Sequence, residues 1–361
     1  MMDKAFLTAK RIYLVFCIAA GLLFVYLMLD FFVIPRDYSD QKPIEIVKST
    51  EKPTEAAEPT AKPTAEPTEE PTAELTAEPT EVPTAKPTEV PTAEPTEVPT
   101  AKPTKTPGPT PSPKINIGSE YHDENVDIVL KQYREHSTEI YVADVKIKSI
   151  LNLKAAFAYN KYGKNIIQTT SQQAKSQNAI LAINGDFYGK REGGYVVRNG
   201  LGYRTNAASS RDRNSYTDLA ILTDGSFRFI EENETSFEEL AELSPWQVFS
   251  FGPALLENGE IQVKKGQDVG QSMASNPRTA IARVSNNHYY FVVSDGRTSE
   301  SEGLSLLELA EFLKSLGAED AYNLDGGGST AMYFNGKIVN KPVNGGKITE
   351  RFVSDIVYIS P

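Results

Sequence analysis

Four short stretches of the chain carry residues whose types and spacing could do acid–base chemistry or bind an anion. In the first, AINGDFYG, an apolar run ends on Asn184, Gly185 and Asp186, and a plain turn after a strand would look the same. In the second, NPRTAIA, Arg278 and Thr279 open a strand. A guanidinium there could bind a phosphate through two parallel hydrogen bonds or pair with a structural carboxylate. Each stretch alone therefore indicates a site without deciding it.

The third stretch is VVSDGR, where Asp295 and Arg297 emerge together from the end of an apolar strand. One of the two could bind an anion while the other handles protons. An Asp-Gly turn with a local ion pair is the simpler alternative. The stretch thus adds a second carboxylate and a second guanidinium to the candidates.

The fourth stretch, YNLDGGGSTA, is the most informative. Successive glycines let the backbone approach a ligand and aim several N–H groups at one point. Asp325 precedes the glycines and adds a carboxylate. Three glycines between two strands lower stability without adding packing, so a functional loop is favoured over a ligand-free turn. The candidate binding residues of this loop are Gly326, Gly327, Gly328, Ser329 and Thr330.

Several classes of site are disfavoured by what the chain lacks. No Lys follows the glycines as in a P-loop, the spacing does not fit a dinucleotide fingerprint, and there is no G-x-S-x-G. The three histidines are scattered and Cys17 is the only cysteine, so the sequence predicts no metal site and specifies no cofactor. A net charge of −11 disfavours nucleic acid as a partner. Carboxylates remain for acid–base work, as in glycoside cleavage.

The chain begins with a candidate membrane segment, well before the four stretches. Residues 12–34 are apolar except for Asp30 and would span roughly 30 Å as a helix. Basic residues precede the run and only Arg36 follows closely, which predicts a cytoplasmic segment 1–11 and an extracellular C-terminal domain at the cell membrane. A cleaved signal peptide is the alternative, but the run is long and no A-x-A-like site follows it.

Residues 35–113 form a Pro/Thr/Glu-rich segment that holds most of the prolines of the chain. Proline about every fourth residue and the lack of aromatic residues from 42 onward predict a disordered, extended linker without a core. The stretch 42–113 could reach about 220 Å at ~3.1 Å per residue. Such a tether suits a thick cell wall, and an inert stalk is favoured over specific binding by the repeat.

The remaining residues 114–361, with a core at about 140–360, predict an α+β domain: a mixed, largely hairpin-connected sheet with few helices. Three Asx-Gly pairs, beginning at Asp224, Asn258 and Asn335, predict hairpin turns. Capping boxes predict helices that begin after Ser305 and Ser236. The expected strands are Glu139–Ile147, Ala179–Asn184, Thr217–Thr223, Ser226–Ile230, Phe249–Leu256, Thr279–Val284, Tyr289–Ser294, Ala321–Leu324, Thr330–Phe334, Lys337–Asn340 and Val353–Ile359.

Taken together, AINGDFYG, NPRTAIA, VVSDGR with GLSLLELAEFL behind it, and NLDGGGSTAMYFNGKIVN resemble the phosphodiester glycosidase family in order and spacing. The resemblance covers roughly residues 140–360, and NLDGGGST is its most specific part. Asp186 and Tyr188 stand where many relatives have N-G-G-F-F, and Ser329-Thr330 stand where relatives often have two serines before threonine. Both departures could alter the sugar that is accommodated.

The resemblance implies hydrolysis of a sugar-1-phosphodiester, or of a phosphate-containing glycan, at its glycosidic bond. Arg278 and Arg297 would then neutralise the leaving phosphate, the glycine amides would bind oxygens, and Asn184 and Thr279 would position the substrate. The candidates for nucleophile or base are Asp325, Asp295 and Asp186, and we expect the first two to converge with both arginines on one pocket. A silent module that binds an anionic wall glycopolymer is the alternative, and a wall amidase or peptidase is weaker still.

Overall fold

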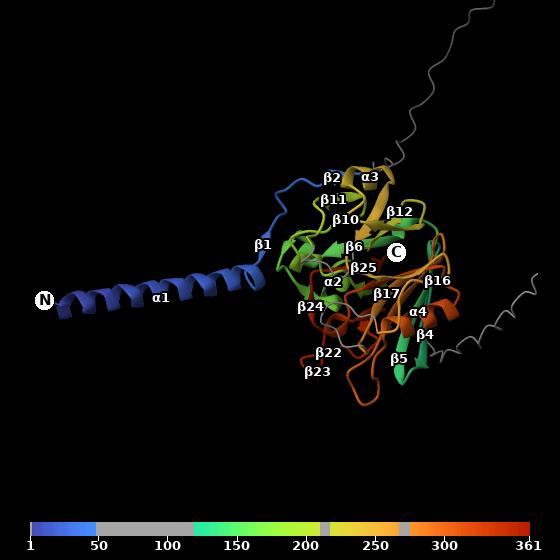
Figure 1. Cartoon of the computed structure of the whole chain (residues 1–361). Helices are drawn as coiled ribbons and strands as arrows, with labels where there is room; N and C mark the ends of the chain where they lie inside the picture. Colours follow the sequence, from blue (N-terminus) through green and yellow to red (C-terminus); the bar gives the residue numbers. More distant parts are fainter. Residues whose placement is uncertain (1, 48–118, 210–216, 267–274) are drawn as a thin grey trace, which may run out of the picture. The chain divides into compact units, whose positions relative to one another are not determined.

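The computed structural model describes residues 2–47, 119–209, 217–266 and 275–361 of the 361 (Figure 1). Helix α1 (Met2–Phe32) includes an 18-residue window, Tyr13–Asp30, with a mean hydropathy of 2.2 and no burial against the rest of the structure. By length and composition, this helix could cross a membrane. The linker predicted for 35–113 lies outside the described residues from residue 48 onward.

Within the described residues, three larger sheets build the domain. The first has the strand order β16 (Glu260–Ile261), β15 (Ala254–Glu257), β19 (Asp320–Leu324), β17 (Thr279–Ser285), β18 (His288–Ser294), β5 (Thr138–Ile147), β4 (Val126–Glu135), β3 (Glu120–His122). The second has β13 (Phe227–Glu231), β12 (Thr217–Leu222), β14 (Pro245–Phe249), β10 (Val196–Arg198), β11 (Leu201–Arg204), β2 (Ile44–Glu45). The third has β21 (Lys337–Ile338), β20 (Met332–Phe334), β9 (Leu181–Asn184), β25 (Asp355–Ile359), β6 (Leu153–Phe157).

Short pairs and helices complete the domain. The two-stranded pairs are β1 (Arg36–Asp37) with β7 (Gly163–Lys164), β22 (Val343–Asn344) with β23 (Lys347–Ile348), and β24 (Phe352–Val353) with β8 (Gln168–Thr169). The helices are α2 (Thr170–Ser176), α3 (Phe237–Glu242) and α4 (Leu306–Ser315). Each of these three helices begins with a complete capping box, which satisfies orphan amides at its first turn. The two helix starts predicted at Ser236 and Ser305 are confirmed.

One apolar core joins the three sheets. Val292 of β18, Phe249 of β14 and Ile183 of β9 belong to the same cluster of buried side chains, and α4 adds Leu309 and Leu313 to it. Strand β9 is buried at all four positions, and β18 and β14 are buried at all but one, so both faces of these strands are covered. The sheets therefore hold one another, and the loops at their ends are fixed by the same core.

The structure differs from the predicted fold in three respects. Every strand pair among the described residues is antiparallel, so the sheets are antiparallel and not mixed. The run predicted as one strand, Phe249–Leu256, divides between β14 and β15, because its middle has Gly252-Pro253 and proline cannot donate to a ladder. Residues 36–47, predicted as linker, pair with the domain through β1 and β2. The turns at Asp224, Asn258 and Asn335 join paired strands as expected.

Candidate functional site

Asn184, at the end of β9, holds three segments together. Its Oδ1 accepts hydrogen bonds from the Thr279 hydroxyl (2.9 Å) and the Ala331 amide (3.3 Å), and its Nδ2 donates to the carbonyl of Asp325. The hydroxyl oxygens of Thr279 and Thr330 lie 3.3 Å apart. Asn184, Thr279 and Thr330 are fully buried. These three predicted substrate-binding residues thus fix the glycine loop against β9 and β17.

Asp325 follows β19 and reaches a small pocket with a volume of about 20 Å³, room for about one ordered water. Burial raises the pKa of its carboxyl to about 6, while the Ser329 hydroxyl and the charge of Arg351 oppose part of that rise. Asp325 is therefore largely ionised at neutral pH yet basic enough to take a proton. The pocket is lined by Ile167, Gly185, Phe187, Lys190, Asp325, Ser329, Arg351, Phe352, Val353, Ser354 and Asp355.

The glycine loop uses its own backbone amides more than predicted. The Gly327 amide donates to the carbonyl of Pro277 (2.8 Å), and the amides of Ser329 and Thr330 donate to loop carbonyls. Of the three glycine amides expected to bind oxygens, that of Gly327 is thus already engaged. This bond attaches the loop to the residue that precedes Arg278, and it makes the Gly327 amide a poorer candidate for a phosphate than the sequence suggested.

Two guanidinium groups pack directly on the glycines. A Cβ on Gly327, whose φ is +60°, would lie 2.9 Å from Nη2 of Arg297. A Cβ on Gly328 would lie 2.8 Å from Nη2 of Arg351. Arg297 is also held by Asn276, whose Oδ1 accepts from its Nη2 at 2.8 Å. The loop that carries Asp325 is therefore flanked by positive charge, as an anionic substrate requires.

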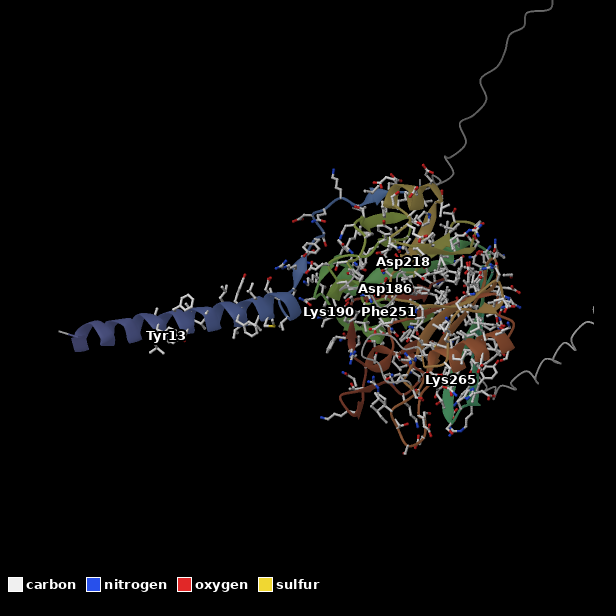
Figure 2. The ribbon with its side chains drawn as sticks, viewed as in Figure 1. Tyr13, Asp186, Lys190, Asp218, Phe251 and Lys265 are labelled. Carbon is white, nitrogen blue, oxygen red and sulfur yellow. The ribbon has the colours of Figure 1, made fainter. Side chains whose placement is uncertain are left out.

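Asp186 is buried inside the domain (Figure 2) and does not line the pocket, although its neighbours Gly185 and Phe187 do. Its carboxylate accepts hydrogen bonds from the Ser250 amide (2.9 Å) and the Tyr188 amide (3.1 Å), and it lies 3.0 Å from Nη2 of Arg198. Burial alone would raise the pKa of this carboxyl, but Arg198 and the Ser250 amide hold it below its ordinary value. Asp186 is therefore a fixed anion, unsuited to proton transfer.

Asp355, at the start of β25, shares Arg198 with Asp186 but also lines the pocket. Its Oδ2 accepts from Nη2 of Arg198 at 2.8 Å, whereas its buried Oδ1 has no hydrogen-bond partner among the described residues. Burial and repulsion from Asp186 raise the pKa of Asp355. A Cβ on Gly185 would lie 2.3 Å from its Oδ1, so only glycine fits beside it. Asp355 is thus a second proton-binding carboxyl at the pocket.

The remaining predicted residues lie at the same end of the eight-stranded sheet but point elsewhere. Thr279 pairs with Leu324 in the ladder, so Arg278 and Asp325 follow at one edge. The Arg278 side chain is buried and its Nε donates to the carbonyl of Leu304 (2.9 Å). Asp295 is buried, accepts from the Lys341 amide (2.7 Å), and has a pKa raised by burial. Of the four residues expected to converge, only Asp325 lines the pocket.

No group of three or more His, Cys, Asp or Glu side chains that could hold a metal ion occurs in the part of the chain that the structure describes. The carboxylates near the pocket are instead balanced by guanidinium groups. The chemistry of the site is therefore built from carboxyls and arginines.

Residues 177–360 match the family model for phosphodiester glycosidases. The chain belongs to the phosphodiester glycosidase family. Residues 48–93 also match the family model for the PT disordered repeat. The matched domain contains every residue of the pocket lining except Ile167.

Named relatives of this phosphodiester glycosidase cover part of it. It is 30% identical over 192 residues to mouse N-acetylglucosamine-1-phosphodiester alpha-N-acetylglucosaminidase, with 48% of this chain and 35% of the mouse protein covered. It is 25% identical over 262 residues to the SPbeta prophage-derived uncharacterized protein YomE of Bacillus subtilis (strain 168), with 66% and 39% covered. The matches thus span between a third and two fifths of these relatives. The zebrafish counterpart of the mouse enzyme, a catalytic domain auto-inhibited by its pro-peptide, shares the fold with a TM-score of 0.52, 19% identity and coverage of 70% and 88%.

Sequence reasoning missed several residues of this glycosidase pocket. Arg351, Phe352 and Asp355 lie in RFVSDIVYI, which the apolar pattern presents as a plain strand. The available signal was the Ser-Asp pair that interrupts the apolar run. Arg198 gave a similar signal as a single charge after two valines, and the structure buries it completely.

Proposed function

We propose that this phosphodiester glycosidase is a membrane-anchored extracellular hydrolase that cleaves the glycosidic bond of sugar-1-phosphodiesters in cell-wall or exopolysaccharide glycopolymers. The observation that carries the proposal is Asp325, a carboxylate with a pKa of about 6 that lines a pocket with room for one water, together with Arg351. The name of the mouse relative makes an N-acetylglucosamine-1-phosphodiester the first substrate to test.

In the proposed reaction, Asp325 acts as the general base. A water in the pocket attacks the anomeric carbon and gives its proton to Asp325, while the bond between that carbon and the bridging phosphate oxygen breaks. The sugar leaves with the new hydroxyl, and the other partner keeps a phosphomonoester. A phosphate is a good leaving group, so stabilising the oxocarbenium-like sugar and placing the water matter most.

Arg351 would bind the phosphate, because its guanidinium is exposed at the pocket and lies over Gly328. Arg297 supports the same loop from the Gly327 side. Phe187 and Phe352 line the pocket with partly exposed rings that can pack on a sugar face. Asp355 keeps its proton to higher pH than an ordinary carboxyl and can donate a hydrogen bond to the substrate.

The test is Asp325→Asn in the full chain, with released sugar and new phosphomonoester both measured. Removing the base should lower turnover by about 10³-fold. Asp127→Asn, which changes an exposed carboxylate of β4, is the matched control and should leave turnover unchanged. If the Asn variant and the parent bind the glycan equally and neither releases sugar, the chain is a binding module and the proposal fails.

The proposed topology rests on α1 and on the basic residues that precede its apolar window. Protease added to intact cells should remove the domain and leave a short membrane fragment. A mature protein that begins after Phe32 would show instead that the segment is a cleaved signal peptide.

A further inference from the structure

The segment that directly follows α1 is bound to the domain along most of its length. Nδ2 of Asn165 donates to the carbonyl of Ile34 at 3.1 Å, two residues after the helix ends. Arg36 and Asp37 then pair with β7, and Nζ of Lys161 lies 2.7 Å from Oδ2 of Asp37. We call residues 34–47 the docking segment.

The second half of the docking segment is bound as firmly. Ile44 and Glu45 pair with β11, and the amides of Ile46 and Val47 donate to the carbonyl of Gly200 at 3.0 and 3.2 Å. Ile46 packs against the cluster that includes Phe237 and Leu240 of α3. Tyr38, earlier in the segment, packs against Tyr162 with ring centroids 5.9 Å apart. Side-chain burial and backbone pairing therefore both hold it in place.

This attachment changes the role of the Pro/Thr-rich residues. The chain leaves the domain at residue 47 and is bound to it again at Ser119, whose carbonyl accepts from the Leu130 amide at 2.7 Å. A segment with both ends on one domain cannot set the distance between that domain and the membrane. The apolar window ends at Asp30, and Ile34 is already bound to Asn165 of the domain. The residues from 30 to 34 therefore set the distance, and they span about 14 Å at most.

The candidate active site is close to this attachment point. Oδ1 of Asn165, the residue bound to Ile34, accepts a hydrogen bond from Nζ of Lys190 at 2.6 Å, and Lys190 lines the Asp325 pocket (Figure 2). A wider cleft of about 530 Å³ adjoins it, because Ile167 lines both hollows. The cleft is also lined by Pro35, Asp37, Tyr159, Lys161, Asn165 and Ile166.

The side chains around these hollows suit a membrane surface. Tyr159, Phe187 and Phe352 are 61%, 39% and 54% exposed, and each lines one of the two hollows. Aromatic side chains with exposed rings favour the membrane–water interface. Large exposed apolar side chains gathered at a hollow mark a surface with a partner.

We propose that the docking segment holds the active site at the membrane surface and that the substrate is a sugar-1-phosphodiester whose aglycone is a membrane lipid. The sugar lies over the Asp325 pocket, against Phe187 and Phe352, with its anomeric carbon beside the water that the pocket can hold. The lipid end runs along the wider cleft past Pro35 towards the bilayer. This inference rests on the proposed function, because it names the aglycone of that same reaction.

Two insertions test it in the full chain reconstituted in liposomes. A 30-residue Gly/Ser insertion between Phe32 and Val33 moves the docked domain away from the bilayer, whereas the same insertion after Thr84 lengthens only the connection that returns to the domain. The substrates are a sugar 1-phosphate esterified to a long-chain lipid alcohol in the same bilayer and its water-soluble methyl diester. A fluorophore at Lys175→Cys in a Cys17→Ser background reports energy transfer to a labelled lipid.

The first insertion should lower both energy transfer and turnover of the lipid-linked substrate, the latter by about tenfold, and leave turnover of the methyl diester unchanged. The second should change neither. Equal energy transfer in the two insertion variants would overturn the docking role. Cleavage of the methyl diester without cleavage of the lipid-linked substrate would overturn the lipid aglycone. Failure to cleave either substrate would refute the proposed function, while energy transfer still decides the docking role.

Discussion

Asp186 and Asp325 follow two similar strand ends, yet the pKa values of their carboxyls are shifted in opposite directions. The sequence is Asn-Gly-Asp at the end of β9 and Asn-Leu-Asp at the end of β19. Asp186 is enclosed with Arg198, and its pKa is lowered. Asp325 has arginines near its loop but no ion pair with any of them among the described contacts, and burial raises its pKa to about 6. A buried carboxylate next to a bound cation becomes structural, whereas one that faces a pocket can exchange protons.

The largest change in stability should come from removing the guanidinium of Arg198. Arg198→Met leaves Asp186 and Asp355 buried together without a positive charge, so the free energy of unfolding should fall by about 4 kcal/mol. Chemical denaturation measures this change. Arg134→Met, which removes a half-exposed partner of Glu139, is the matched control and should lower stability by far less. An equal loss of unfolding free energy in both variants would show that the two buried carboxyls do not depend on the charge of Arg198.

The two aspartates should also respond to neutralisation with opposite signs. The folded-state pKa of Asp325 exceeds its unfolded value, so its stabilising protonation is complete below about pH 4 and lost as pH rises through about 6. Asp325→Asn should therefore be more stable than the parent at pH 7.5, by about 2 kcal/mol, and equal to it near pH 4. Asp186→Asn should be less stable than the parent at pH 7.5. Chemical denaturation at both pH values measures these changes. If both variants were more stable than the parent at pH 7.5, or both less stable, the two carboxyls would not differ as described.

The smallest effect should distinguish the two arginines that the site offers to a phosphate. Arg351→Lys keeps the charge but loses the planar fork, so kcat/KM should fall about tenfold for a phosphodiester and little for a neutral glycoside. Arg278→Lys serves as the comparison, because Arg278 is buried and donates to the Leu304 carbonyl. It should lower the melting temperature and affect both substrates alike. Selective loss of the phosphodiester in Arg278→Lys would restore the role that the sequence gave it.

The sequence predicted what depends on local patterns. Hairpin turns at Asn258 and Asn335 and the helix after Ser305 follow from short-range chemistry, and the structure has them. The glycine loop was likewise recognisable as a special place, since no packing would justify GGG. The direction of the Arg278 side chain was not predictable, because it depends on Leu304, which is 26 residues away.

Contacts between residues that are far apart in the sequence also explain why other site residues were missed. Burial raises the pKa of Asp355, and the charge of Asp186, which the pairing of β25 with β9 brings next to it, raises that pKa further. A Ser-Asp pair shows that an apolar strand is interrupted, but it does not show which residues the aspartate will contact. Residues 36–47 were missed for a different reason: their polar, proline-flanked composition resembles a linker, and their pairing partners lie more than 120 residues further along.

Strand β2 occupies the edge of the six-stranded sheet, beside β11. A fragment that begins at residue 114, which is the natural choice for soluble expression, would lose β2 and leave the amides and carbonyls of β11 unpaired. Such an edge is a template for pairing between molecules. We therefore expect this fragment to aggregate, and supplying residues 34–47 as a synthetic peptide should restore its solubility.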